Sequence, residues 1–212
     1  MIAVVDAGLG NLRSVVRALN AAGAGEEVRL VSDPQGVRDA SRVIVPGQGA
    51  FGDCARALRP DQPLGGAIVS SIKSGKPYLG ICLGLQVLFD SSEESPGHPG
   101  LGIFPGKVVK LPSRAVDTDG RRLKVPHIGW SPVALRGHHP VLGAILEPWF
   151  YFVHSFHARP RDEELVAGVC AFGTMPLTAA VAYNNIVGVQ FHPEKSQTSG
   201  LTLLRAFLDW RC

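Results

Sequence analysis

Short apolar runs alternate with helix-patterned segments through the first ninety residues. The run Ile2–Asp6 is apolar and rich in β-branched residues, which is typical of a buried parallel strand. After it, Leu12, Val15 and Leu19 recur at helical spacing as far as Gly23. The same patterns predict strands over Val28–Val31, Arg42–Val45 and Tyr78–Ile81, and helices over Pro63–Ser74 and from about Leu83 to Phe89. This alternation predicts an α/β fold whose mostly parallel central sheet has helices on both faces.

The second half of the chain changes character, because strand patterns dominate it. Five strands are predicted there, over Lys107–Leu111, Trp149–Val153, Leu165–Ala171, Ala179–Tyr183 and Ile186–Gln190. The dipeptide Asn184-Asn185 between the last two is typical of a tight hairpin turn. We therefore expect an antiparallel extension of the parallel sheet.

A terminal helix is predicted by the spacing of Leu201, Leu204 and Leu208, which would share one face. The segments Ser91–Gly102 and Ser113–Arg122 are loop-like, and neither is long enough to separate two domains. The chain also has no internal repeat. We therefore expect a single domain over residues 1–212.

Composition agrees with a globular α/β protein. A chain of 212 residues can bury one sizeable core, and 45% hydrophobic with 18% charged residues is ordinary for a soluble protein. The net charge of +3, without a run of Lys or Arg, indicates no nucleic-acid partner. Neither a signal peptide nor a membrane span is indicated, so we expect a cytoplasmic protein without a membrane partner.

The four cysteines are widely scattered, and no two form a Cys-x-x-Cys pair. This spacing argues against both a zinc site and a disulfide framework. We expect reduced cysteines, no metal and no cofactor.

The strongest local signal for chemistry is the segment Gly80–Gly84, which reads Gly-Ile-Cys-Leu-Gly. A strand that meets a helix with a glycine two positions on either side of a cysteine is typical of a nucleophile elbow. At the helix start, Cys82 would favour the thiolate, and the N–H of Leu83 would face an oxyanion. On residue type alone, a buried structural cysteine is the better interpretation. The flanking glycines favour the nucleophile.

A thiolate needs a base, and His192 has the best context among the seven histidines. It follows the strand Ile186–Gln190 and lies two residues before Glu194. In extended backbone these two positions share a face, so Glu194 could orient one imidazole nitrogen while the other faces Cys82. The competing histidines lie in Gly- and Pro-rich loops and look solvated, or lack an acidic neighbour in phase: His98, His138, His139, His127 and His157. The alternative for His192 is a surface His-Pro turn.

A third segment, Pro46–Phe51, directly follows the strand Arg42–Val45 and reads Pro-Gly-Gln-Gly-Ala-Phe. In a doubly wound sheet, ligands bind outside the carboxyl ends of the strands. The glycines Gly47 and Gly49 would let backbone N–H groups approach a substrate or a developing oxyanion. The alternative is an ordinary strand-to-helix turn.

Together these motifs resemble a known family, the class I glutamine amidotransferases. The resemblance rests on Gly80–Gln86, on Gln190–Ser196 and on the glycine-rich segment after an early strand. It implies a flavodoxin-like α/β fold. More narrowly, the chain is similar to glutaminase subunits of imidazole glycerol phosphate synthase in its segments Asp6–Ser14, Pro46–Phe51, Pro126–Trp130, Tyr151–Ser155 and His192–Ser196.

The resemblance implies a mechanism for hydrolysing L-glutamine to glutamate and ammonia. Cys82 would attack the carboxamide to form a thioester, His192 would carry protons, and Glu194 would orient His192. Backbone N–H groups near Gln48 and Leu83 would hold the oxyanion. Glutamine would be bound with the help of Gln86, Ser155 and Phe156.

The resemblance also implies a partner, a cyclase subunit with a (β/α)₈ barrel that receives the ammonia in a heterodimer. Tyr151 and Lys195 match positions near that interface and its tunnel entrance. They could equally be a strand aromatic and a solvated lysine. Departures from the family pattern stand at three positions, where Tyr, Asn and Tyr are usual: Ala7, Ser131 and Phe156.

Two other interpretations stay open at this point. The chain could be an amidotransferase that is free-standing or has a different partner, or a non-catalytic binding module that keeps the fold. If it is a glutaminase regulated by a partner, Gly47–Gly49 is the candidate switch, because its glycines could permit a peptide flip.

Overall fold

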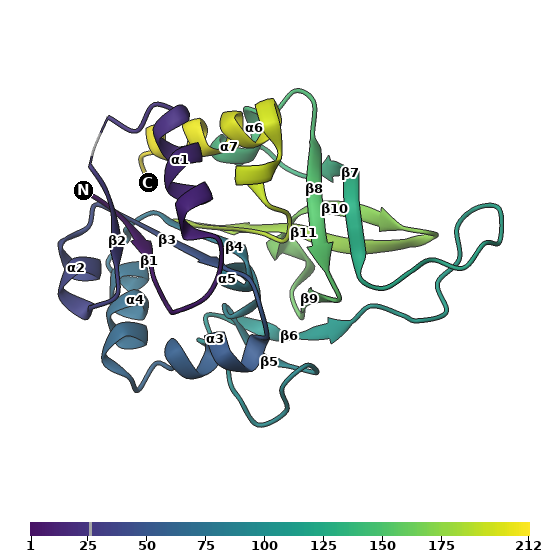
Figure 1. Cartoon of the computed structure of the whole chain (residues 1–212), viewed down its shortest axis with the longest axis horizontal. Helices are drawn as coiled ribbons and strands as arrows, with labels where there is room; N and C mark the ends of the chain where they lie inside the picture. The colour runs from purple at the N-terminus through teal and green to yellow at the C-terminus, as the bar shows by residue number, and fades with distance from the viewer. Residues whose placement is uncertain (26) are drawn as a thin grey trace.

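The computed structural model describes residues 1–25 and 27–212. Its main feature is a nine-stranded sheet with the order β2-β1-β3-β4-β12-β11-β10-β7-β8 (Figure 1). The first five strands in this order are parallel: β2 (Val28–Val31), β1 (Ile2–Val5), β3 (Arg42–Gly47), β4 (Tyr78–Cys82) and β12 (Ile186–Val189). The remaining strands are antiparallel to their neighbours: β11 (Met175–Tyr183), β10 (Val166–Phe172), β7 (His127–Leu135) and β8 (Trp149–His154).

This architecture confirms the predicted α/β fold with a parallel sheet and an antiparallel extension. The order of the parallel strands is that of a flavodoxin-like sheet, in which ligands bind at the carboxyl ends of the strands. The hairpin between β11 and β12 is also confirmed, since Tyr183 pairs with Ile186 and Asn184 has a φ of 49°. Asn185 fixes this turn by donating to the carbonyls of Ile72 and Lys76.

Helices cover both faces of the parallel sheet (Figure 1). The purple α1 and yellow α7 lie together with α6 on one face, and α2, α3 and α4 lie on the other. Their bounds are α1 Leu12–Ala21, α2 Pro34–Asp39, α3 Phe51–Ala57, α4 Pro63–Lys73, α6 Pro140–Gly143 and α7 Gln197–Asp209.

The continuous apolar strands are explained by two cores, one on each face of the sheet. In β1, Ile2 and Val4 pack into the core that includes α1 and α7, whereas Ala3 and Val5 pack into the opposite core. Successive strand residues point to opposite faces, so a strand covered on both sides must be apolar throughout.

A second, three-stranded sheet lies beside the carboxyl end of β4 and has the order β5-β6-β9. Its strands are β5 (Phe89–Ser92), β6 (Phe104–Lys110) and β9 (Phe156–Pro160). Short helical elements complete the chain: α5 (Leu83–Gln86), η1 (Glu163–Leu165) and η2 (Pro193–Lys195).

The predicted helix from Leu83 to Phe89 was therefore too long, since α5 is a single turn. The carbonyls of Val87 and Leu88 accept hydrogen bonds from Leu101 and Phe104, and Phe89 pairs with Phe104 in the small sheet. Long-range backbone pairing thus ends the helix where local periodicity would continue it. Pairing with β6 also places Ser91 and Ser92 in strand β5, although both belong to the predicted loop Ser91–Gly102.

The terminal helix was placed correctly, but its buried face was assigned wrongly at one position. Leu203, Leu204 and Phe207 are fully buried, whereas Leu201 is 36% exposed.

Strands β5, β7 and β9 were not predicted at all. Within the described residues, no helix is long and apolar enough to cross a membrane.

Candidate active site

Cys82 lies at the carboxyl end of β4, in a backbone conformation that side-chain-bearing residues rarely adopt. Its φ is 54° and its ψ is −103°. The turn is possible because both flanking glycines lack a Cβ. A Cβ on Gly84 would lie 1.7 Å from the carbonyl oxygen of Val45, and one on Gly80 would lie 2.3 Å from the carbonyl oxygen of Gly84. The structure thus has the tight strand-to-helix turn that the glycines predict.

The side chain of Tyr78 stabilises the elbow from within the core. This side chain is fully buried, and its hydroxyl donates to the carbonyl oxygen of Gly84 at 2.8 Å. Because α5 has only four residues, its dipole is weaker than the predicted longer helix would supply. Individual groups around the sulfur therefore matter more than the helix as a whole.

His192 and Glu194 form a buried pair directly after β12. His192 Nδ1 lies 2.8 Å from Glu194 Oε1, and the two side chains are 1% and 2% exposed. The predicted pair is present, but the predicted backbone geometry is wrong. Glu194 lies in the 3-10 turn η2, so the turn at Pro193, and not an extended strand, brings the carboxylate to the ring. The hydroxyl of Ser196 fixes this turn by donating to the carbonyl of His192 at 2.6 Å.

The charge state of His192 is set by its neighbours against the effect of burial. Burial lowers its pKa, but Cys82 and Glu194, through hydrogen bonding and charge, outweigh this and raise the pKa to about 9. Among the described residues, Nε2 has no partner at conventional hydrogen-bond geometry, so its interaction with the Cys82 sulfur is a longer contact. The arrangement favours the protonated imidazolium form of His192.

A cavity of about 380 Å³ opens beside Cys82. Its lining residues are Gln48, Gly49, Cys82, Leu83, Gln86, Glu94, Pro126, Val153, His154, Ser155, Phe156 and Lys195. They come from the ends of β3, β4 and β8, from α5, η2 and the start of β9, from the loop after β5 and from the residue before β7. The structure therefore brings together most of the residues predicted for the site.

Four of the predicted site residues do not line this cavity: the buried pair His192 and Glu194, and also Gly47 and Tyr151. Gly47 lies in β3, paired with Cys82, where a Cβ would approach the Cβ of Leu83 to 2.6 Å. It allows the two strand ends to pack closely. Tyr151 lies on β8 outside the cavity, in contact with Trp130 at 6.2 Å between ring centroids and with Lys195 Nζ at 6.0 Å from the ring centroid.

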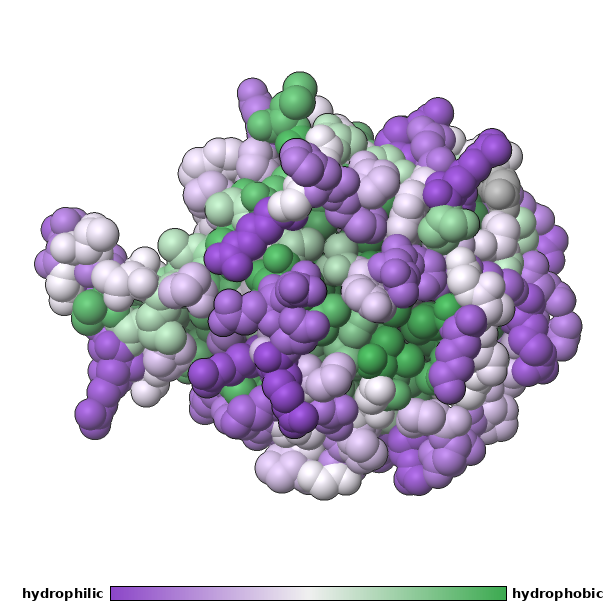
Figure 2. All heavy atoms as spheres, turned by 180° about the vertical axis from the view of Figure 1, so that it is seen from behind, coloured by the Kyte–Doolittle hydropathy of each residue, from purple (hydrophilic) through white to green (hydrophobic). Residues whose placement is uncertain are grey.

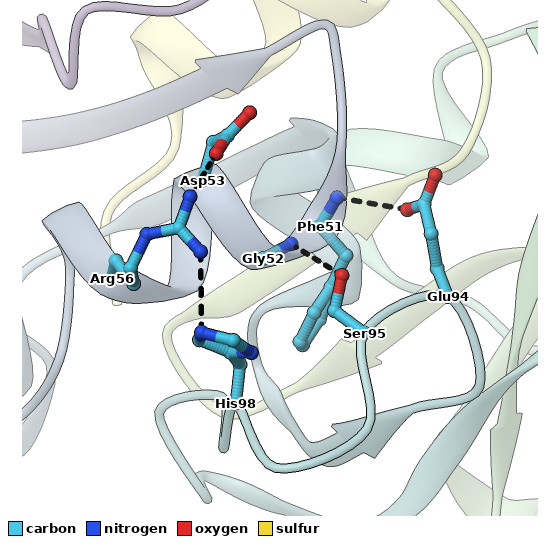
Figure 3. A network of polar contacts seen from close by, with 7 residues as sticks. All are labelled: Phe51, Gly52, Asp53, Arg56, Glu94, Ser95 and His98. Carbon is cyan, nitrogen blue, oxygen red and sulfur yellow. Dashed lines mark hydrogen bonds and ion pairs between the residues drawn. The ribbon is translucent and has the colours of Figure 1, made fainter.

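Glu94 is a cavity residue that the sequence analysis missed, since the loop that carries it has no motif. Figure 3 shows how this loop is held against the start of α3. Glu94 Oε2 accepts from the N–H of Phe51 at 2.8 Å, and Ser95 Oγ accepts from the N–H of Gly52 at 3.1 Å. Glu94 therefore both lines the cavity and caps the helix that follows the Gly47–Gly49 segment.

The histidines that were expected to be solvated differ in the structure. His98 is half-buried and lies 3.1 Å from Arg56 Nη1 (Figure 3). His139 is half-buried too, and it contacts the ring of Trp210 with centroids 4.7 Å apart. Only His138 is exposed as expected.

Gln190 was also missed as an individual site residue. It is fully buried, and its Nε2 lies 3.5 Å from the sulfur of Cys82. Its Oε1 accepts from Gln86 Nε2 at 3.0 Å, and the same nitrogen donates to the carbonyl oxygen of Phe156 at 3.1 Å. Gln190 belongs to a motif that carries the resemblance, but spacing alone does not reveal these contacts.

Comparison with known proteins agrees with the fold. The family profile "Glutamine amidotransferase class-I" matches residues 3–210, and the chain belongs to this family. Proteins called "Imidazole glycerol phosphate synthase subunit HisH" are similar over nearly their whole length. The one from Aromatoleum aromaticum is 48% identical over 99% of this chain and 98% of its own. The one from Pyrococcus furiosus is 42% identical over 97% of both chains.

Solved structures share the fold. A chain of "Structure of PurLQS from Thermotoga maritima" has a TM-score of 0.75 and 20% identity and covers 98% of this chain and 97% of that one. A crystal structure of a glutamine amidotransferase has a TM-score of 0.69 and 22% identity, covering 98% and 97%. At this level of identity the likeness shows the common fold alone.

Proposed function

We propose that this chain is the glutaminase subunit of an imidazole glycerol phosphate synthase. It hydrolyses L-glutamine to glutamate and ammonia, and the ammonia goes to a cyclase subunit that makes imidazole glycerol phosphate and AICAR in histidine biosynthesis. The proposal is supported by relatives of that name that are 42–48% identical over nearly the full length. The observation that carries the chemistry is the strained Cys82 beside the buried pair of His192 and Glu194.

In the proposed reaction, His192 transfers one proton in each half, first to the leaving nitrogen and then from the attacking water. The thiolate attacks the carboxamide carbon, and the imidazolium gives its proton to the departing nitrogen, which leaves as ammonia. A γ-glutamyl thioester stays on Cys82. Neutral His192 then takes a proton from water as the oxygen attacks the thioester, and the thiolate leaves as glutamate is released. Glu194 keeps the imidazole oriented and balances its positive charge.

The oxyanion of each tetrahedral intermediate would be held by backbone N–H groups of Leu83 and of the segment Gly47–Gly49. Leu83 follows the nucleophile, and Gln48 and Gly49 line the same cavity. Gly49 has a φ of 121°, a conformation that favours glycine. A peptide flip within Gly47–Gly49 remains our candidate for the switch that a partner controls.

Groups in the cavity would recognise both the α-ammonium group and the α-carboxylate of glutamine. The carboxylate of Glu94 suits the α-ammonium group, and the backbone at Ser155 and Phe156 suits the α-carboxylate. Gln86 Oε1 is buried and has no hydrogen-bond partner within the described residues, so it can accept an N–H of the substrate. Phe156 contacts the Gln86 side chain through its backbone carbonyl, so Phe in place of the usual Tyr leaves this hydrogen bond unchanged.

The partner would dock on the exposed face of β7 and β8. Ile128, Trp130 and Trp149 are 59%, 44% and 51% exposed there, which is unusual for large apolar side chains. Tyr151 and Lys195 lie at the edge of this face next to the cavity. A (β/α)₈ barrel seated here would receive ammonia from the site directly, and we place the complex in the cytoplasm.

An ammonia-transfer assay tests the proposal. The chain is mixed with a candidate cyclase subunit and its nucleotide substrate, and product formation is compared with glutamine and with added ammonium salt. We expect glutamine to support the reaction in the wild type, and Cys82→Ala to abolish it while ammonium salt still works. Glutamine-dependent product from Cys82→Ala would disprove the mechanism. A glutaminase rate that does not respond to the cyclase would disprove the partner.

A further inference from the structure

Three polar groups form a hydrogen-bonded series that ends at the sulfur of Cys82. They are the carbonyl of Phe156, the amide of Gln86 and the amide of Gln190, joined by hydrogen bonds of 3.1 Å and 3.0 Å. The last amide nitrogen lies 3.5 Å from the sulfur. Gln86 is 3% and Gln190 is 0% exposed, so bulk water does not compete for these bonds.

The chain of bonds decides which end of each amide faces the sulfur. A carbonyl oxygen can only accept, so Phe156 requires the NH₂ of Gln86 to face it. The same NH₂ contacts Gln190, which must therefore present its oxygen there. Gln190 then has only its NH₂ left for Cys82, and the sulfur is the acceptor of an N–H.

The first member of the chain is itself held from a second side. His154 Nδ1 lies 2.9 Å from the carbonyl oxygen of Phe156, and His154 Nε2 lies 3.0 Å from His127 Nδ1. Burial lowers the pKa of His154 to about 3, so the ring is neutral and its one N–H serves the carbonyl. His127 donates to His154, and its other nitrogen accepts from the hydroxyl of Ser131 at 2.9 Å. Each hydrogen bond in this series therefore has one fixed donor and one fixed acceptor.

We propose that Gln190 is a further catalytic residue of the glutaminase reaction, which donates an N–H to the Cys82 sulfur and stabilises it as the attacking thiolate. The inference rests on the function proposed above. A donor aimed at a buried anion favours the charged form and also restricts where the sulfur points. Gln86 is then a positioning residue, because it fixes the orientation of the Gln190 amide.

The competing role for Gln190 is purely structural, in which it only holds Gln86 in place for glutamine binding. That role predicts a higher KM and an unchanged sulfur. Direct donation predicts a less reactive sulfur even toward a reagent that does not use the glutamine site. The two roles therefore differ in a measurement that needs no substrate.

The experiment measures alkylation of Cys82 by iodoacetamide in the full chain, followed by mass spectrometry of the peptide that contains it. The background is Cys212→Ser, because Cys212 is exposed. Burial raises the pKa of Cys54 and Cys170 to about 12, so both stay unreactive thiols. In this background Gln190→Met keeps the length of the side chain and removes the N–H.

We expect Gln190→Met to slow alkylation at neutral pH about 10- to 100-fold, the range for a hydrogen bond to a charged group. The pH at which alkylation reaches half its maximal rate should rise. The titratable groups around the sulfur are unchanged in this variant: His192, Cys54, and the cavity residues Glu94, His154 and Lys195. With the cyclase present, kcat should fall by a similar factor with little change in KM.

An unchanged alkylation profile together with a raised KM would overturn the proposal in favour of the structural role. Gln86→Met is the matched variant, since it loses the orienting amide but keeps the donor. It should raise KM and slow alkylation less than Gln190→Met does. Equal slowing in both variants would indicate general loosening and would also overturn direct donation.

Gln190→Glu decides the matter if Gln190→Met does not fold by circular dichroism. It still accepts from Gln86 but presents a carboxylate oxygen to the sulfur, so alkylation at neutral pH should slow at least as much. Wild-type alkylation would again overturn the proposal. Cys82→Ala distinguishes a failure of the proposed glutaminase function from a failure of the role proposed for Gln190. Glutaminase activity in that variant refutes the proposed function, whereas an inactive Cys82→Ala with a normal Gln190→Met refutes only the role of Gln190.

Discussion

The parallel and antiparallel halves of the nine-stranded sheet bury their residues differently. Every residue of β1 and β4 is buried, because helices cover both faces of the parallel half. In β7 exposed positions alternate mostly with half-buried ones, and in β8 buried positions alternate with exposed or half-buried ones. The aromatic side chains of Trp130 and Trp149 remain in solvent. A strained backbone such as that of Cys82 persists only where its surroundings over-determine it. The difference teaches that the proposed nucleophile needs the doubly covered half, whereas a docking face needs the half with a free surface.

The largest expected effect comes from Gly84→Ala, which breaks the parallel half at the elbow. Its Cβ would lie 1.7 Å from the carbonyl oxygen of Val45. Neither atom can move away by a side-chain rotation, because the position of each is set by the backbone. We expect a destabilisation above about 4 kcal/mol, or no folded protein at all. Urea unfolding measures this loss.

Gly143→Ala is the control for that substitution. Gly143 lies in α6 with no atom within 4 Å of an added Cβ. Its unfolding free energy should stay within about 1 kcal/mol of the wild type. If both variants unfold at similar urea concentrations, steric exclusion at the elbow is not what the glycine supplies.

The next largest effect concerns the charge that supports His192. Glu194→Gln keeps a hydrogen-bond acceptor for Nδ1 and removes the negative charge. We expect kcat of the cyclase-stimulated glutaminase to fall roughly 10²- to 10⁴-fold, with a smaller change in KM. Steady-state kinetics would contradict the assignment if KM rose and kcat did not change.

The same pair makes the stability of the parallel half depend on pH. The pKa of His192 is raised from 6.5 to about 9, so its protonation stabilises the folded state fully below pH 6.5. This contribution is lost as the pH rises through about 9. Urea unfolding from pH 6 to 10 should show the decline in the wild type, and His192→Asn should lack this component. Parallel declines in both proteins would assign the pH dependence to another group.

Trp130→Ala tests the antiparallel half and should leave the fold intact. Removing a large exposed aromatic side chain from a docking face typically weakens binding by about 10- to 100-fold. Titration calorimetry with the cyclase subunit measures this. Leu30→Ala is the control, because Leu30 is 48% exposed on β2 at the opposite edge of the sheet. Equal losses in both variants would remove β7 and β8 as the docking face.

The smallest effect is expected from Ser131→Ala, at the far end of the polar series that leads to Phe156. It removes one donor to His127 on β7. We expect about a two- to fivefold rise in the KM for glutamine and an unchanged alkylation rate of Cys82. A KM for glutamine equal to that of the wild type would show that Ser131 and His127 do not influence the substrate site.

Local patterns predicted most of the parallel half. The strand at Ile2, the elbow glycines and the hairpin at Asn184 each follow from rules that act over a few residues. The failures share one cause. The helix after Leu83 is cut short by pairing with residues beyond Gly100, and β5, β7 and β9 are strands because of partners far along the chain.

The predicted pair of His192 and Glu194 shows how a contact that is present in the structure can be predicted from the wrong backbone geometry. Spacing by two residues suggested an extended strand, yet the 3-10 turn η2 makes the contact. Glu94 had no local signal, because its role depends on a loop being held against α3. Gln190 lies within a recognisable motif, but its direction toward Cys82 depends on the carbonyl of Phe156.

By itself, the sequence determined the class of fold, the position of the elbow and the identity of the proposed nucleophile and base, because these follow from local periodicity and from glycines that a tight turn requires. Only the tertiary structure decided which groups surround the sulfur, which face stays open to a partner and how His192 is charged. Those properties come from contacts between residues about a hundred positions apart, such as Cys82 with Gln190. A hydrogen bond or a shifted pKa is a property of the assembled neighbours, and no single segment carries it.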